Sequence, residues 1–86
     1  MIEREIIKVD RDINGRITAL RNQYKGWSPI SIEEAVKQIE YNICKYYINA
    51  TNIGKVEIHV ISDKNGKFLR TDPSRTSRNI LMDLAN

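Results

Sequence analysis

The sequence is short of the residues from which many small functional sites are built. Cys44 is its only cysteine, which excludes an internal disulfide and a zinc cluster of thiolates. It also contains no glycine-rich phosphate loop, no serine-nucleophile motif, no pair of catalytic carboxylates and no cysteine–histidine pair at catalytic spacing. From these absences we expect a protein that is not an enzyme and that holds no cofactor and no metal ion.

Long apolar runs are missing as well. No stretch approaches the roughly 20 consecutive apolar residues that cross a bilayer. Met1 runs directly into Glu3, Arg4 and Glu5, without the apolar core of a secretion signal. We therefore expect a cytoplasmic protein that does not bind membranes.

The composition is typical of a folded chain. Hydrophobic residues make up 41% of the sequence and charged residues 29%, proportions that argue against disorder. A chain of 86 residues has room for one core, so we expect a single domain over residues 1–86. Residues 74–86 are expected to form a partly mobile tail, in which Ile80, Leu81 and Leu84 predict docking back on the core as a short helix.

Two asparagine–glycine dipeptides punctuate the extended regions. Asn14-Gly15 and Asn65-Gly66 both tolerate the positive φ angles of tight hairpin turns. Residues 6–13 and 16–22 flank the first dipeptide. The second is preceded by an alternating stretch over residues 56–60 and followed by residues 67–71. The sequence therefore predicts two β-hairpins.

The register of the first hairpin has two alternatives. A two-residue turn places Val9 opposite Leu20, whereas a bulged three-residue turn places Val9 opposite Ala19 and Ile17 opposite Arg11. The two registers bury opposite faces, and the sequence does not choose between them.

One amphipathic segment lies between the hairpins. Ser31 and Glu34 form a capping-box pattern at its start. Apolar side chains then recur at helical spacing in one stripe: Ile32, Ala35, Val36, Ile39, Ile43, Tyr46 and Tyr47. This pattern predicts a helix that continues through Tyr47 and ends between Asn49 and Gly54. The expected fold is α+β, ordered β-β-α-β-β, with an antiparallel sheet of two hairpins and the helix packed on one face.

Two isolated features each have a functional and an ordinary interpretation, and a third, Cys44, has an ordinary one. Residues 10–15 match the first half of a calcium loop, but Arg21 stands where the bidentate glutamate is needed, and a hairpin turn explains the same residues. Trp27 and Tyr24 either stack on a base or ring, or, for Trp27, cover one end of the core. Cys44 is expected to pack as a small hydrophobe.

His59 is the only histidine and a candidate general base. Glu57 lies two residues earlier on the same strand face and is its possible partner. Together with Arg70 these side chains define one alternative, a small enzyme or ligand binder. The ordinary interpretation is a surface or structural histidine.

Basic residues gather late in the chain, whose net charge is +3. Lys67, Arg70, Arg75 and Arg78 are the candidates for binding phosphate oxygens or another anion, which makes weak nucleic-acid binding a second alternative. The ordinary interpretations are a solvated edge and, for Arg70, a hydrogen bond to the turn at Asp72.

Several fragments together resemble a small bacterial domain family of unknown function, number 3892. They are Gly15-Arg16-Ile17-Thr18, Ser31 with Glu33-Glu34-Ala35, His59-Val60, Leu69-Arg70 before Asp72-Pro73, and the tail Asn79-Ile80-Leu81-Met82-Asp83-Leu84. The resemblance covers about Glu5 to Leu84 and brings no established activity. Residues 41–54 look longer than the family's usual connection, and the proline expected after the last leucine is absent.

The leading hypothesis is a non-enzymatic binding or accessory module that contacts an unknown macromolecule through a sheet edge or the basic tail. Self-association by strand addition at an open edge is a further form of the same hypothesis.

Overall fold

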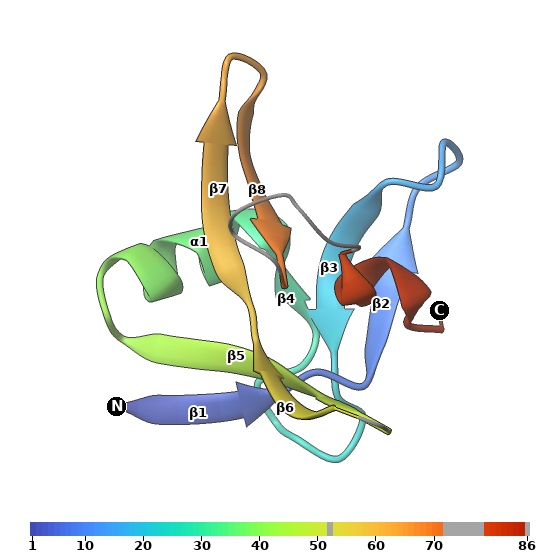
Figure 1. Cartoon of the computed structure of the whole chain (residues 1–86), viewed down its shortest axis with the longest axis vertical. Helices are drawn as coiled ribbons and strands as arrows, with labels where there is room; N and C mark the ends of the chain where they lie inside the picture. Colours follow the sequence, from blue (N-terminus) through green and yellow to red (C-terminus); the bar gives the residue numbers. More distant parts are fainter. Residues whose placement is uncertain (52, 72–78, 86) are drawn as a thin grey trace.

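The computed structural model describes residues 1–51, 53–71 and 79–85. The predicted α+β class is confirmed (Figure 1). In chain order the elements are β1 (Ile2–Glu5), β2 (Lys8–Arg11), β3 (Ile17–Arg21), β4 (Ile30–Ser31), α1 (Ile32–Glu40), β5 (Cys44–Ala50), β6 (Gly54–Glu57), β7 (His59–Asp63), β8 (Gly66–Arg70) and the 3-10 helix η1 (Ile80–Asp83). Neither helix in the described ranges has the length and apolar character needed to cross a bilayer.

The strands form three small sheets instead of one. Their orders are β1-β5-β6, β2-β3-β4 and β7-β8. The β1–β5 pair is parallel, and the other pairs are antiparallel. The predicted β-β-α-β-β order with one antiparallel sheet is therefore wrong. The physical reason is that β1 pairs with a strand some forty residues later, a contact that no local pattern specifies. Helix α1 packs against strands of all three sheets instead of one face.

The first hairpin, β2–β3, combines both predicted registers. Val9 lies opposite Leu20 as in the two-residue alternative, while Arg11 lies opposite Ile17 as in the bulged one. The shift falls between Asp10 and Arg11 and is a β-bulge. It keeps Val9 and Leu20 together in the core, where both are fully buried. The strand predicted over residues 6–13 is shortened to residues 8–11.

The helix begins where the sequence predicts but ends much earlier. Ser31 is its N-cap, and the Ser31 Oγ accepts a hydrogen bond from the Glu34 N–H at 3.1 Å. Tyr41 is the C-cap, and Asn42 adopts a positive φ of 59° that stops the helix. The prediction that the helix continues through Tyr47 is therefore wrong.

Residues 44–50 form β5 because their side chains alternate. Cys44, Tyr46 and Ile48 are buried, whereas Lys45 and Asn49 are exposed. Tyr46 thus fits both the helical stripe and the two-residue period, and the second pattern prevails because β1 and β6 supply hydrogen-bond partners on both sides. The expectation that Cys44 packs as a small hydrophobe is confirmed.

The stretch predicted as one strand over residues 56–60 is divided at Ile58. The part before it pairs with β5, and the part after it pairs with β8. Ile58 itself is buried, and its N–H donates to the Tyr46 carbonyl at 2.8 Å. The division directs the chain from one sheet into the next.

The second hairpin, β7–β8, is confirmed. Asp63 lies opposite Gly66, so Lys64 and Asn65 form the turn. The Asp63 carboxylate accepts the Asn65 N–H at 2.7 Å, and Gly66 takes the positive φ of 116° that favours glycine.

Residues 79–85 return to the core. Leu81 is buried, and the Val9 N–H donates to the Ala85 carbonyl at 2.9 Å. The Arg11 Nη2 donates to the carbonyls of Met82 and Leu84, at 2.7 and 3.1 Å, and so holds the end of η1. This part of the predicted tail docks as a short helix. Residues 74–78 lie outside the described residues.

Trp27 packs against one end of the core, which is the structural alternative for this side chain. Its ring meets the Tyr46 ring edge-on, with centroids 5.9 Å apart. The Arg4 guanidinium lies over Trp27 at 5.2 Å, and its Nη1 donates to the Tyr46 hydroxyl at 2.9 Å. Tyr24, in the same loop, is 76% exposed.

Candidate functional site

The structure places the predicted pair His59 and Glu57 beside one another. The His59 Nδ1 is 3.9 Å from Glu57 Oε2, which is too far for a hydrogen bond. Lys45 Nζ is 3.8 Å from the other Glu57 oxygen. The Glu57 carboxylate therefore lies between two groups on an open surface. In the part of the chain that the structure describes, neither contact encloses the His59 ring.

Arg70 lies directly opposite His59 on the β7–β8 ladder. The register thus brings the three residues of the predicted ligand site to one part of the molecule. Three of the hollows formed by described residues have walls from α1, the first hairpin, η1 and the β7–β8 hairpin. None of the three is lined by His59, Glu57 or Arg70.

The predicted basic candidates are not brought into one patch by the described residues. Lys67 Nζ is 2.8 Å from a Glu40 carboxylate oxygen, so its charge is paired. Arg75 and Arg78 lie outside the described residues. Only Lys67 and Arg70 of this set can be placed, and they belong to one strand.

The half-motif for calcium is used in the first hairpin turn. The Asp12 Oδ1 accepts the N–H groups of Asn14 and Arg16, both at 2.9 Å. Arg21 donates to the Asp10 carboxylate at 2.6 Å, and this ion pair raises the pKa of Arg21. The turn interpretation is confirmed, and both flanks are strands.

Sequence reasoning missed a surface at the beginning of β1. We call it the β1-end patch, and it comprises four exposed apolar side chains: Met1, Ile2, Tyr41 and Ile43. Ile2 pairs in register with Cys44, so the chain entering β1 and the chain entering β5 lie side by side. The exposed fractions of the four patch residues are 66% for Met1, 55% for Ile2, 74% for Tyr41 and 53% for Ile43. The four residues therefore lie near one end of the β1–β5 pair, and exposed apolar side chains close to one another are typical of interaction surfaces.

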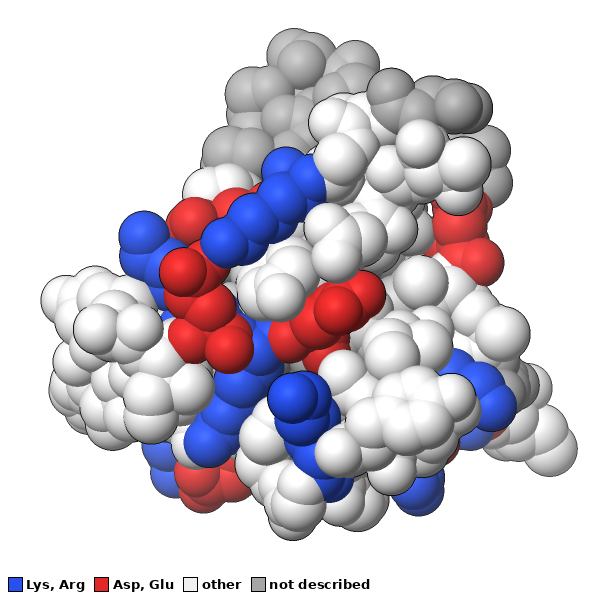
Figure 2. Space-filling model, turned by 90° about the horizontal axis from the view of Figure 1, so that it is seen from below, with Lys and Arg blue, Asp and Glu red and all other residues white. Residues whose placement is uncertain are grey.

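Figure 2 shows this end of the sheet from below. Uncharged residues gather at the left, the end at which β1 begins in Figure 1, whereas charges of both signs interleave across the middle. We call the charged part the ion-paired face, comprising Glu3, Lys45, Lys55 and Glu57. The Lys55 ammonium donates to Glu3 and lies 4.6 Å from the Tyr47 ring centroid. The hydrogen bond from Lys55 lowers the pKa of Glu3.

The outer edge of β1 adjoins the patch. β1 is the terminal strand of its sheet. The Ile6 N–H donates to the Tyr47 carbonyl, so alternate residues face β5 and the backbone of Glu3 and Glu5 faces away. The Glu5 carbonyl accepts the Asn22 Nδ2 at 3.0 Å, which covers that end of the edge. None of the described residues covers the part beside the patch, at Glu3, which is the part suited to strand addition.

Tyr41 and Ile43 are exposed because α1 ends at Glu40. The sequence pattern predicts a longer helix, and the surface was therefore not predicted. In a helix that continued through Tyr47, Ile43 would belong to the buried stripe. The alternation of Cys44, Tyr46 and Ile48 was the signal that indicates a strand instead.

Comparison with known proteins identifies a family but no activity. A family model described as protein of unknown function (DUF3892) matches residues 5–85, nearly the whole chain. The match confirms the resemblance carried by the short sequence fragments. No curated protein and no solved structure matches the chain.

Proposed function

Because the chain belongs to the family described as protein of unknown function (DUF3892), its role has to be argued from its surface, and we propose that it is a non-enzymatic protein-binding module. The observation that carries this proposal is the β1-end patch beside the open edge of β1. A partner strand adds to this edge through main-chain hydrogen bonds. Apolar side chains of the partner cover Tyr41 and Ile43.

Charge favours a different protein over a second copy. β1 reads Ile2-Glu3-Arg4-Glu5. Antiparallel pairing of two β1 edges keeps the same faces together, so every symmetric register that pairs three residues within Ile2–Glu5 places Glu3 opposite Glu3 or Glu5. Like charges directly opposite one another destabilise a sheet. The partner strand therefore carries an uncharged or basic residue opposite Glu3.

The two alternatives receive less support from the described residues. For nucleic-acid binding, Lys67 is neutralised by Glu40, and Arg75 and Arg78 lie outside the described ranges. For a catalytic or ligand site, none of the three hollows is lined by His59, Glu57 or Arg70. We therefore favour the protein interface.

Site-specific photocrosslinking tests the proposal. A photoreactive phenylalanine is placed at Tyr41 and, as a matched control, at Tyr24, which is equally exposed but lies in the loop over residues 23–29. In the native host we expect a discrete protein adduct from position 41, identified by mass spectrometry, and none from position 24. The adduct disappears in an Ile43→Asp background. Adducts from both positions, from neither, or with a second copy of the chain would contradict the proposal.

A further inference from the structure

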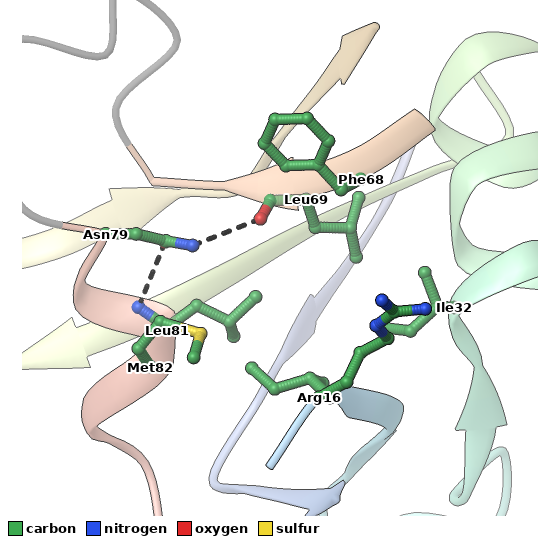
Figure 3. Close-up of a pocket in the computed structure, with 8 residues that line it drawn as sticks. Arg16, Ile32, Phe68, Leu69, Asn79, Leu81 and Met82 are labelled. Atoms are coloured by element: carbon green, nitrogen blue, oxygen red, sulfur yellow. Dashed lines mark hydrogen bonds between the residues drawn. The ribbon is translucent and has the colours of Figure 1, made fainter. Parts of the chain in front are cut away.

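A small apolar hollow lies on another part of the molecule, between the first hairpin, α1, β8 and η1. Its volume is about 170 Å³. Figure 3 shows that side chains from these four elements converge on it. Its apolar walls are supplied by Ile17, Ile32, Phe68, Leu69, Leu81 and Met82.

Among the described residues, Arg16 is the only charged one that lines this hollow. Its backbone is held on both sides by Asp12, whose carboxylate accepts the Arg16 N–H and whose own N–H donates to the Arg16 carbonyl. The side chain extends toward Ile32 in Figure 3. Among the described residues the Arg16 guanidinium has no hydrogen-bond or ion-pair partner, unlike Arg21 on the same strand pair.

The other polar group of the hollow is already occupied. Asn79 Oδ1 accepts the N–H groups of Thr71 and Leu81, at 3.0 and 3.3 Å. Its Nδ2 donates to the Leu69 carbonyl at 3.2 Å. Asn79 is therefore a structural residue, and Arg16 is the group that remains available to select a ligand.

The adjoining hollow has a different character. It shares Arg16 and Phe68 but is also lined by Asp63 and Lys67, which bring charges of both signs. Selection by charge is therefore sharpest in the apolar hollow, where Arg16 is the one cation among the described lining residues.

The size of the hollow sets the size of the ligand. A cavity of roughly 150 Å³ with aliphatic and aromatic walls holds one benzene molecule. Drug-sized ligands need several hundred Å³. The hollow therefore accommodates one phenyl ring or one branched aliphatic group. A guanidinium binds a carboxylate through two parallel hydrogen bonds, so an acid attached to that group completes the match.

We propose that the Arg16 hollow binds a small free carboxylic acid with one aromatic or branched aliphatic group. The apolar group lies against Ile32, Phe68 and Met82, and the carboxylate pairs with Arg16. This inference is independent of the protein interface at the β1-end patch, since the two surfaces share no residue.

Titration with 3-phenylpropionate, followed by the NMR signals of the Met82 and Ile32 methyl groups, tests this proposal. We expect saturable shifts at millimolar acid and an affinity about tenfold weaker for the neutral 3-phenylpropanamide, because the ion pair with Arg16 is lost. Acetate, which lacks the apolar group, should give no saturable shift.

Three variants separate the two halves of the interaction. Arg16→Ala weakens the acid about tenfold and leaves the amide unchanged, whereas Lys25→Ala removes an exposed loop cation and changes neither. Met82→Trp fills the hollow from a half-exposed position and abolishes binding of both compounds.

Three results would overturn the proposal: no saturable shift in the folded wild-type chain, equal affinity for the acid and the amide, or no loss in Arg16→Ala. The last experiment measures the affinity for a peptide that ends in phenylalanine. Tighter binding of the peptide than of the free acid would also overturn it, since the site would then recognise protein carboxyl termini.

Discussion

The ion-paired face of the β1-β5-β6 sheet and the β1-end patch differ in how they meet solvent. On the ion-paired face, the carboxylates of Glu3 and Glu57 each have a lysine neighbour, Lys55 and Lys45 respectively. At the β1-end patch, apolar side chains are exposed and the adjoining strand edge is open. The sheet therefore carries a surface whose charges are satisfied internally and adjoins one whose contacts are incomplete.

For the interface that we propose, charge alone is therefore a poor guide. The basic residues that stand out in the sequence include Lys67, which the fold pairs with Glu40. Exposed ion pairs contribute little to stability and leave little net field for a partner. The apolar end, in contrast, leaves unfavourable contacts with water that binding removes.

Removing the support beneath both surfaces is expected to have the largest effect. Tyr46 is fully buried on the inner side of β5 and contacts Trp27 and Arg4. Tyr46→Ala leaves a cavity and unpaired polar groups, so we expect a loss of about 3–5 kcal/mol in the free energy of unfolding, by analogy with other buried aromatic residues. Urea denaturation measures it. A loss below about 1 kcal/mol would show that β5 is not the common support.

Changing the β1-end patch should separate binding from folding. The double variant Tyr41→Ser/Ile43→Asp is expected to lower the affinity for the crosslinked partner more than about tenfold, because two exposed apolar side chains are lost from the proposed interface. Its unfolding free energy should stay within about 0.5 kcal/mol of the wild-type value, since both side chains are exposed.

The matched control for this variant lies on the ion-paired face. Lys45→Ser replaces an exposed side chain near the start of β5, two residues after Ile43, and should leave partner affinity unchanged, as measured by calorimetry. Equal losses for the patch variant and for Lys45→Ser would erase the distinction between the two surfaces.

Tyr46, on the inner side of the sheet, is expected to make the fold less stable at alkaline pH. Burial raises the pKa of Tyr46 above its ordinary value of 10.0. The unfolded chain therefore releases this proton first, and stability that is present below pH 10 falls as the pH rises from there through the folded pKa. The thermal midpoint of Tyr46→Phe should decline less steeply with rising alkaline pH than that of the wild type. The other tyrosines are common to both proteins, so the difference between the two slopes reports Tyr46. Identical slopes would refute this assignment.

The ion-paired face predicts the smallest effect, in acid. Lys55 lowers the pKa of Glu3 below its ordinary value of 4.5, so the contribution of this pair is present above 4.5 and is lost as the pH falls through the lower folded value. Because both side chains are exposed, the contribution is small and weakens with salt. Thermal scans of Glu3→Gln should lack this component in dilute buffer and match the wild type in concentrated salt.

Local chemistry explains which parts of the fold the sequence predicts. Both asparagine–glycine turns and the Ser31 cap are correct because a few adjacent residues decide them. The prediction of a helix beyond Glu40 is wrong because Ile43 and Tyr46 fit a helical spacing, while Tyr46 also fits the two-residue period of a strand. The choice depends on pairing with β1, which is distant in sequence.

The candidate site follows the same division. The β7–β8 hairpin is predictable from the dipeptide Asn65-Gly66, but the pairing of His59 with Arg70 is not. It depends on the turn falling at Lys64-Asn65, because a turn centred on Asn65-Gly66 would shift the register by two residues. The β1-end patch is not predictable either, because the exposure of Tyr41 and Ile43 depends on where α1 ends.

Amide hydrogen exchange of Glu3 tests the central claim most directly. In the free chain its N–H faces away from β5 and should exchange much faster than the N–H of Ile6, which donates to Tyr47. Addition of the partner captured at position 41 should slow exchange at Glu3 and leave the control loop at Tyr24 unchanged. An unchanged Glu3 rate in the saturated complex, or a Glu3 amide already protected in the free chain, would contradict the account.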